Sequence, residues 1–355
     1  MRARITIQGI DILDKSMPCC SFQVMACLYP KKLTVFPDKT HTFTSGRDSR
    51  IVFGQWIDSV NSDGEMTQLY EVPCGKCSEC RKAKRRLWSQ RLQLEASCYP
   101  ENEVWFITLT YDDEHITECP QGKYGLYSLC YEHFQQFVLS IKNFVRRNKG
   151  DLFPDDARFR YFLGMEYGSR FARPHGHLIT FGIDLSELGE LLPVSETEEG
   201  TLFSSSFVSR FWHRGYNTVC AATPANMCYV TGYVDKKLES NFDYEARGLK
   251  PEKCFMSTKP AMGTEFFERN KDLIKECGGY VNPYDGSFHK LPRSSLRNVF
   301  SDDPYFVAIV NHRKKISAIR QLNNEDAARG ERSELARARI AKAEAEAVKI
   351  NRAKL

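Results

Sequence analysis

The stretch FRYFLGMEYGSRFARPHGHLITFGI, residues 159–183, restricts the possible folds more than any other part of the chain. Two runs rich in aromatic and branched apolar residues flank a turn that contains Gly168, Ser169 and Arg170. This pattern is typical of a β-hairpin, in which two antiparallel strands are joined by a short turn. The sequence therefore predicts an antiparallel sheet that includes this hairpin.

Other segments predict a further strand and several helices. The segment EVWFITLTYDDE, residues 103–114, alternates in the manner of a strand. Apolar residues recur at helical spacing within residues 78–96 and 127–148. Residues 206–216 and 226–240 also favour helix, although the Tyr, Val and Thr content of the second segment is compatible with a strand. We therefore expect an α+β fold with a central antiparallel sheet and packed helices.

The composition limits the class of protein. A chain of 355 residues that is 42% hydrophobic can bury a sizeable core. It has no apolar run long enough to span a membrane, and its first 30 residues do not resemble a signal peptide. Its 13 cysteines are an odd number. Without an export signal, this favours reduced thiols in a cytosol over a disulfide framework.

Shifts in composition divide the chain into four regions. We expect a loose extension over residues 1–24 and a cysteine-rich, basic, DNA-binding region over residues 25–98. A catalytic domain would follow over residues 99–299, and a charged tail over residues 300–355. The tail is rich in Ala, Glu, Lys and Arg with few large apolar residues. This composition predicts a helix held by charge pairs, or disorder.

A pair of histidines, His175 and His177, stands one residue apart in the second strand of the hairpin. Residues i and i+2 of a strand point to the same face, so both imidazoles are expected side by side. Glu166 lies in the partner strand and can face them, and a carboxylate would complete a site for a divalent cation. The alternative is that the two histidines are incidental and Glu166 is an ordinary strand residue.

A second candidate group is YVTGYVDKK, in which Tyr229, Tyr233 and Lys237 are spaced by four. On a helix these side chains share one face. Two tyrosines at this spacing more often pack in a core. The lysine one turn further on, with polar Thr231 and Asp235 between, argues against a buried stripe.

Phosphodiester transfer to tyrosine is the chemistry that needs this set of residues. A phenol is a weak nucleophile, so a cation held by His175, His177 and Glu166 would polarise the phosphate. Lys237 would stabilise the developing negative charge. Two tyrosines one turn apart would allow the covalent link to pass from one to the other.

A cysteine cluster precedes these motifs. Cys74, Cys77 and Cys80 form a C-x2-C-x2-C run, which supplies three of the four ligands of a structural zinc site. Cys27 is the expected fourth ligand, and Cys19 and Cys20 compete for that role. Unliganded thiols and an iron–sulfur centre are the alternatives.

Basic residues follow the cysteines directly. The run RKAKRR lies in the first half of the helix expected over residues 78–96. A solvated face is the usual explanation of such a run, but a basic helix beside a nicking site favours contacts with the DNA backbone. The DNA-contacting residues that we expect are Lys82, Lys84, Arg85 and Arg86, together with Arg173 before the histidines.

These motifs resemble those of a known family. FITLTYDDE, RPHGHLITFG and YVTGYVDKK resemble, in order and spacing, the three motifs of replication initiators of the Microviridae, most closely the gokushovirus branch. Those proteins belong to the HUH endonuclease superfamily. MACLYP and PCGKCSECRKAKRRLWSQRLQLE resemble the N-terminal part of the family, so the likeness covers about residues 25–293. Gly176 departs from the pattern, because the residue between the histidines is usually bulky and apolar.

The resemblance implies a function. It predicts an HUH-type, metal-dependent endonuclease and ligase that nicks single-stranded or supercoiled phage origin DNA and stays joined to the 5′-phosphate through tyrosine. It implies Mg²⁺ or Mn²⁺ as cofactor, in addition to the zinc ion suggested by the cysteines. It also implies a host helicase and polymerase as partners and the cytoplasm of the bacterial host as location. The alternative functions are an HUH transposase or plasmid relaxase, and a non-catalytic DNA-binding protein derived from a prophage.

Overall fold

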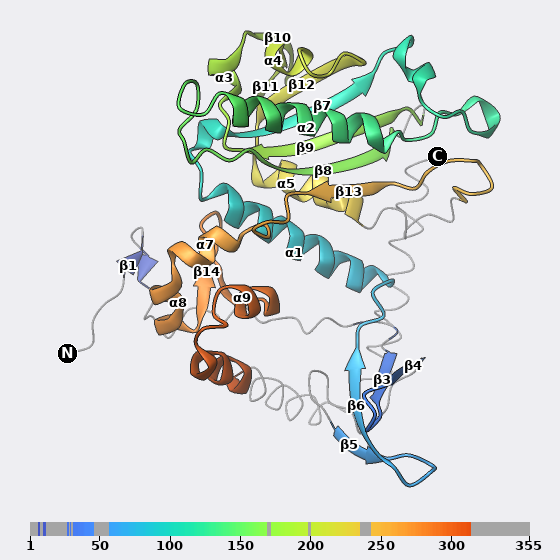
Figure 1. The fold of residues 1–355 in the computed structure, drawn as a ribbon, viewed down its shortest axis with the longest axis vertical. Coiled ribbons are helices and arrows are strands. Elements are labelled where there is room, and N and C mark those ends of the chain that lie inside the picture. The colour runs from blue at the N-terminus through green and yellow to red at the C-terminus, as the bar shows by residue number, and fades with distance from the viewer. Residues whose placement is uncertain are drawn as a thin grey trace. The chain divides into compact units, whose positions relative to one another are not determined.

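The structure, a computed structural model, describes residues 6–7, 10–11, 27, 29, 31–45, 57–168, 172–197, 200–234 and 243–313. The chain divides into two compact units (Figure 1). The first, which we call the sheet unit, comprises residues 84–271 and 281–287. The second, the cysteine unit, comprises residues 1–83, 272–280 and 288–355. The four regional boundaries expected from composition stay a prediction.

A seven-stranded sheet forms the centre of the sheet unit. The strand order is β10-β11-β12-β7-β9-β8-β13, and each neighbouring pair is antiparallel. The strands are β7 (Val104–Tyr111), β8 (Arg160–Tyr167), β9 (Pro174–Phe181), β10 (Leu191–Thr197), β11 (Gly200–Ser205), β12 (Gly215–Ala221) and β13 (Lys253–Met256). The expected hairpin is the β8–β9 pair, and the expected α+β fold with a central antiparallel sheet is confirmed.

Helices accompany this sheet. They are α1 (Ser78–Ala96), which begins in the cysteine unit, α2 (Tyr131–Arg147), α3 (Leu185–Leu188), α4 (Ser206–Ser209), α5 (Pro224–Thr231) and α7 (Thr264–Arg269). Short 3-10 turns occur at η1 (Glu101–Glu103), η2 (His115–Glu118), η3 (Lys123–Gly125) and η4 (Gly232–Val234). The α1 helix has the bounds expected from its sequence.

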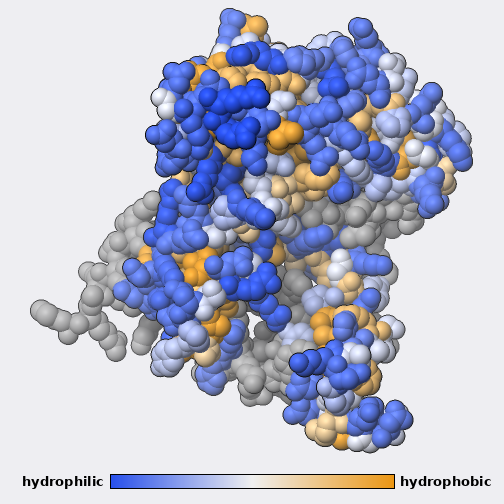
Figure 2. All heavy atoms as spheres, in the orientation of Figure 1, coloured by the Kyte–Doolittle hydropathy of each residue, from blue (hydrophilic) through white to orange (hydrophobic). Residues whose placement is uncertain are grey.

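The two faces of the sheet carry different helices. Phe134, Phe137 and Ile141 of α2 are buried in one cluster with Ile107 and Leu109 of β7. The outer surface over α2 is mainly hydrophilic, as expected for an amphipathic helix (Figure 2). The opposite face packs against α5 and the second half of α1, through a cluster of Leu92, Phe162, Ile179, Met227, Val230 and Tyr233.

Two of the expected helices are shorter than predicted. Helix over residues 206–216 was expected, but α4 covers only Ser206–Ser209 and β12 begins at Gly215. Gly215 has a φ of +139°, and a Cβ there would lie 2.3 Å from the backbone nitrogen of Asp112. Glycine therefore permits the close approach of β12 to the end of β7. The tyrosine helix, expected over residues 226–240, changes into η4 at Gly232.

The cysteine unit has smaller sheets. A four-stranded antiparallel sheet has the order β4-β3-β6-β5. Its strands are β3 (Lys31–Val35), β4 (His41–Ser45), β5 (Ile57–Val60) and β6 (Met66–Val72). Two further antiparallel pairs are β1 (Thr6–Ile7) with β2 (Ile10–Asp11), and β14 (Gly279–Val281) with β15 (Phe288–Lys290). The later helices are α8 (Lys271–Cys277) and α9 (Arg293–Asn298).

None of the helices in the described part of the chain has both the length and the apolar character needed to cross a membrane.

Candidate active site and cysteine cluster

Strand register brings the candidate metal ligands together on the sheet face that carries α5. His175 of β9 pairs with Thr110 of β7 on one side and with Glu166 of β8 on the other. His177 pairs with Thr108 of β7 in the next row on this face. Because residues directly opposite one another in an antiparallel pair point to the same face, these side chains share one surface.

Both histidines are oriented by threonines. Thr108 Oγ1 lies 3.1 Å from His177 Nδ1, and Thr110 Oγ1 lies 3.0 Å from His175 Nδ1. His177 Nε2 lies 3.0 Å from Glu166 Oε1, and both of these residues are buried. The threonines were not recognised in the sequence. The signal was present, because Thr108 and Thr110 repeat with the same period of two as the histidines.

The chemistry of these donors fits a divalent cation. A hydrogen bond at Nδ1 fixes the ring and leaves Nε2 as the ligand nitrogen, as is usual for metal-binding histidines. Two adjacent ligands of an octahedral ion at about 2.1 Å are separated by about 3 Å. The His177–Glu166 contact already has that length. An ion between them would replace the shared proton, and His175 would complete the set from the same strand face.

The two candidate nucleophiles have different surroundings. Tyr229, in α5, is 52% exposed, whereas Tyr233, in η4, is 5% exposed. The Tyr233 hydroxyl donates to Glu166 Oε1 at 2.8 Å, and that of Tyr229 is 3.5 Å from the same oxygen. Both rings contact the His177 ring, with centroids 5.3 Å away in each case. Burial, together with the neighbouring Glu166 carboxyl, raises the pKa of Tyr233.

Glycines make room for these side chains. A Cβ at Gly164 would lie 2.8 Å from the Tyr233 ring, and one at Gly168 would lie 2.6 Å from His175 Nε2. A Cβ at Gly176, between the histidines, would lie 2.5 Å from the Phe134 ring of α2. The departure from the expected bulky residue is therefore compensated, because Phe134 fills the space under the strand.

Two further residues of the motifs lie elsewhere. Lys237 lies outside the described residues, so its role stays a prediction. Tyr111, at the end of β7, is fully buried on the α2 side of the sheet, and its hydroxyl lies 3.0 Å from His133 Nδ1. Burial raises the pKa of Tyr111. It is therefore remote from the histidine face and is not placed as a nucleophile.

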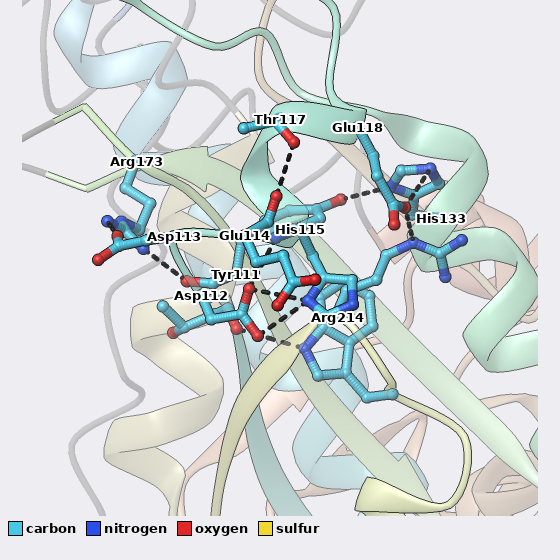
Figure 3. A network of polar contacts seen from close by, with 12 residues as sticks. Tyr111, Asp112, Asp113, Glu114, His115, Thr117, Glu118, His133, Arg173 and Arg214 are labelled. Carbon is cyan, nitrogen blue, oxygen red and sulfur yellow. Dashed lines mark hydrogen bonds and ion pairs between the residues drawn. The ribbon is translucent and has the colours of Figure 1, made fainter.

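A polar network fixes the loop after β7 (Figure 3). The Asp112 carboxylate accepts from the backbone nitrogen of His115 at 2.7 Å, and this bond lowers the pKa of Asp112. Arg173 Nη1 donates to the Tyr111 carbonyl at 2.7 Å, and its other nitrogen pairs with Asp113. Arg173 therefore ties the start of β9 to the end of β7, and its expected contact with DNA stays a prediction.

A pocket of about 310 Å³ opens beside His177. It lies between β7 and the first half of α5. Its lining residues are Phe106, Thr108, His177, Ala225, Asn226 and Tyr229. Aromatic rings, a hydroxyl and an amide thus surround a space next to the exposed tyrosine. The volume is at the lower end of the range for small-ligand sites, about 300–1,000 Å³.

The basic residues of α1 are not equivalent. Lys82, Lys84 and Arg86 are exposed, and Lys82 pairs with Glu79 at 3.3 Å. Arg85 is half-buried, and its Nη2 donates to the Gly232 carbonyl at 3.4 Å. Arg85 therefore contacts the turn between the two tyrosines, whereas the other three side chains face solvent.

The four expected cysteines form one cluster in the cysteine unit. The sulfur atoms of Cys27, Cys74, Cys77 and Cys80 all lie within 4.8 Å of one another. The Cys77–Cys27 and Cys74–Cys80 sulfur pairs are 3.9 and 4.0 Å apart. A tetrahedral zinc ion with bonds of about 2.3 Å has sulfur–sulfur edges of about 3.8 Å, so the cluster fits this ion. Cys19 and Cys20 lie outside the described residues.

Backbone amides point at the sulfur atoms of this cluster. Burial opposes ionisation of Cys74, but bonds from the Lys76 and Cys77 nitrogens, at 3.4 and 3.3 Å, outweigh it and lower the pKa of Cys74 to about 7. Burial raises the pKa of Cys80 and of Cys27. A metal ion binds thiolates, so these amides stabilise the metal-binding form of Cys74.

Comparisons with known proteins define the class. Residues 104–238, which include both histidines and both tyrosines, match the family model of the replication-associated protein ORF2. Replication-associated protein ORF2 of Spiroplasma virus 4 is 29% identical over 303 residues, 82% of this chain and 87% of the relative. No solved structure matches the chain significantly.

Two further relatives are more distant. Replication-associated protein ORF4 of Chlamydia phage 1 is 26% identical over 240 residues, 67% of this chain and 56% of the relative. Replication-associated protein VP4 of Bdellovibrio phage phiMH2K is 26% identical over 238 residues, 63% of this chain and 66% of the relative. Residues 104–238 thus belong to the replication-associated protein ORF2 family, and the expected likeness to phage replication initiators is confirmed.

Proposed function

We propose that the chain starts rolling-circle replication by nicking one strand of a phage origin and joining itself to the DNA through tyrosine. The observation that carries the proposal is the convergence of His177 and both tyrosines on Glu166. The matches to replication-associated proteins of phages support a role in DNA replication over the transposase and relaxase alternatives. A set of donors suited to a cation beside an exposed phenol supports catalysis over simple DNA binding.

The proposed step exchanges one phosphodiester bond for another. The Tyr229 oxygen attacks the scissile phosphorus, a bond from this oxygen to phosphorus forms, and the bond from phosphorus to the 3′-oxygen breaks. The tyrosine proton passes to Glu166 or to water, and the leaving 3′-oxygen becomes a hydroxyl. When bound, Mg²⁺ or Mn²⁺ supplies charge stabilisation at the phosphate. Lys237 would add a positive charge, on the evidence of its spacing alone.

A nicking assay tests this function. We expect the chain to form a covalent adduct with a 3′-labelled single strand, from a set tiled across the genome that encodes it. The adduct should survive denaturing electrophoresis, appear with Mg²⁺ or Mn²⁺, and disappear with a chelator, because the phosphate must be polarised. Binding of the same strand without adduct, at all tiled positions and with both ions, would leave only the non-catalytic alternative.

We also propose that the cysteine cluster holds one structural zinc ion. Elemental analysis of the purified chain should give about one zinc per chain. The double variant Cys77→Ser, Cys80→Ser should lose the zinc, while Cys277→Ser, outside the cluster, should keep it. Because binding of structural zinc contributes to folding, the double variant should also become sensitive to proteolysis in residues 27–83. Zinc retained by the double variant would refute this site.

The exposed part of α1 is proposed to contact phosphates. Replacing Lys84 and Arg86 with alanine should weaken binding to origin and random DNA alike, and lower the salt slope by roughly one to two units. The matched control replaces Arg146 and Arg147, exposed on α2 at the opposite sheet face, and should have little effect. Filter binding at several salt concentrations measures both. A loss confined to origin DNA would mean that α1 reads sequence.

The other expectations stay proposals. A host helicase and polymerase would extend the free 3′-hydroxyl, and the reaction would take place in the cytoplasm of the bacterial host.

A further inference from the structure

A row of side chains continues the candidate active site across two more strands. Tyr216 of β12 pairs with Thr110 of β7, which pairs with His175 of β9, which in turn pairs with Glu166 of β8. Directly opposite residues of antiparallel strands point to the same face. Tyr216 therefore lies on the histidine face, two strand spacings or about 10 Å from His175.

Burial along β12 agrees with this orientation. Asn217 and Val219 are buried, and Val219 belongs to the core cluster on the α2 side. Tyr216 points the other way and is 68% exposed. The α5 helix packs on β8 and β9, so the same face remains accessible over β12. A large aromatic ring thus stands in solvent on an inner strand of the sheet, beside the proposed ligands.

The pocket beside His177 extends this surface. Phe106 and Thr108, which line the pocket, follow Thr110 on the same face of β7. The surface therefore runs from Tyr216 over the threonines to Phe106 and the exposed Tyr229. It combines aromatic rings with hydroxyl groups. These are the groups that hold single-stranded nucleic acid, because bases stack on aromatic rings and hydroxyls donate to phosphates.

We propose that this surface, formed by Tyr216, Thr110, Thr108 and Phe106, is the binding track for single-stranded DNA next to the scissile phosphate, with one base stacked on Tyr216. The inference rests on the proposed nicking function, because the strand must reach Tyr229. A single strand is the fitting occupant, since a base must leave its duplex stack before an aromatic side chain can stack on it.

The test measures binding separately from cleavage. Fluorescence anisotropy in the presence of a chelator gives the Kd for a single-stranded oligonucleotide that the wild type nicks when Mg²⁺ or Mn²⁺ is present. Tyr216→Ala should weaken binding about 5- to 100-fold, the loss expected for one base–aromatic stack. Tyr216→Phe should bind as the wild type does, because it retains the ring. Tyr305→Ala removes another exposed tyrosine, in the cysteine unit, and serves as the control.

A fluorescent base identifies the stacked position. With 2-aminopurine placed at successive positions near the nick, one position should be quenched by the wild type and by Tyr216→Phe, but not by Tyr216→Ala. Unchanged affinity and unchanged quenching in Tyr216→Ala would overturn the track while leaving the nicking function intact. The exposed tyrosine would then suit a protein partner better. A wild type that neither binds nor nicks any tiled strand would overturn the proposed function and the track together.

Discussion

Tyr229→Phe is expected to lower formation of the first covalent adduct by about a thousandfold or more, because it removes the accessible nucleophile. Tyr233→Phe should retain this first cut and lose the second one, which closes the circle. The expectation follows from their surroundings: Tyr229 is exposed, and Tyr233 is buried with its hydroxyl bonded to Glu166 at 2.8 Å. Tyr233 must leave that bond before it can attack.

Mass spectrometry of the peptide joined to the DNA separates the two tyrosines. With a short origin strand that permits one cut, the adduct should map to Tyr229. With a substrate that permits two cuts, adducts should map to Tyr229 and to Tyr233, and the double variant should form none. Adducts divided equally after a single cut would contradict the order. An adduct on Tyr111 would remove the assignment of α5, since Tyr111 is buried under α2.

Elements with a long hydrophobic period were predictable from the sequence. The helix α1, the helix α2 and the hairpin β8–β9 each bury a regular set of apolar residues, and their patterns indicated them correctly. The segment around α4 was not predictable in the same way. Its aromatic residues are buried, but Gly215 lets the chain turn into β12 after one helical turn. Tertiary packing outweighs local propensity there.

The candidate site was predictable as a set of residues and not as a set of environments. The period of two places His175 and His177 on one face in any strand. Spacing by four also brings Tyr229 and Tyr233 to Glu166, although the helix changes at Gly232. Their unequal burial depends on how α5 packs over β8 and β9, which is a long-range contact that no local pattern encodes. The alignment of Tyr216 with His175 likewise requires the strand order.

His177→Ala is expected to lower metal-dependent nicking by about a thousandfold or more, because the cation would lose a ligand at the centre of the site. Thr108→Val, which removes the hydrogen bond to His177 Nδ1, should weaken metal affinity about 10- to 100-fold and leave residual nicking at high Mn²⁺. Binding of Mn²⁺ followed by electron paramagnetic resonance separates loss of the ion from loss of chemistry. Affinity for single-stranded DNA in a chelator should be unchanged in both variants.

Glu166→Gln distinguishes the two roles that one carboxylate serves. Its Oε1 accepts from Tyr233 and lies 3.0 Å from His177 Nε2, so the same atom would bind the cation and hold the second tyrosine. An amide has no charge and is a poor ligand for Mg²⁺, yet its oxygen can still accept from Tyr233. Nicking should therefore fall as in His177→Ala while the fold is retained. Normal cleavage by Glu166→Gln would assign the third ligand elsewhere, and full cleavage by the double variant His175→Ala, His177→Ala would remove the metal site altogether.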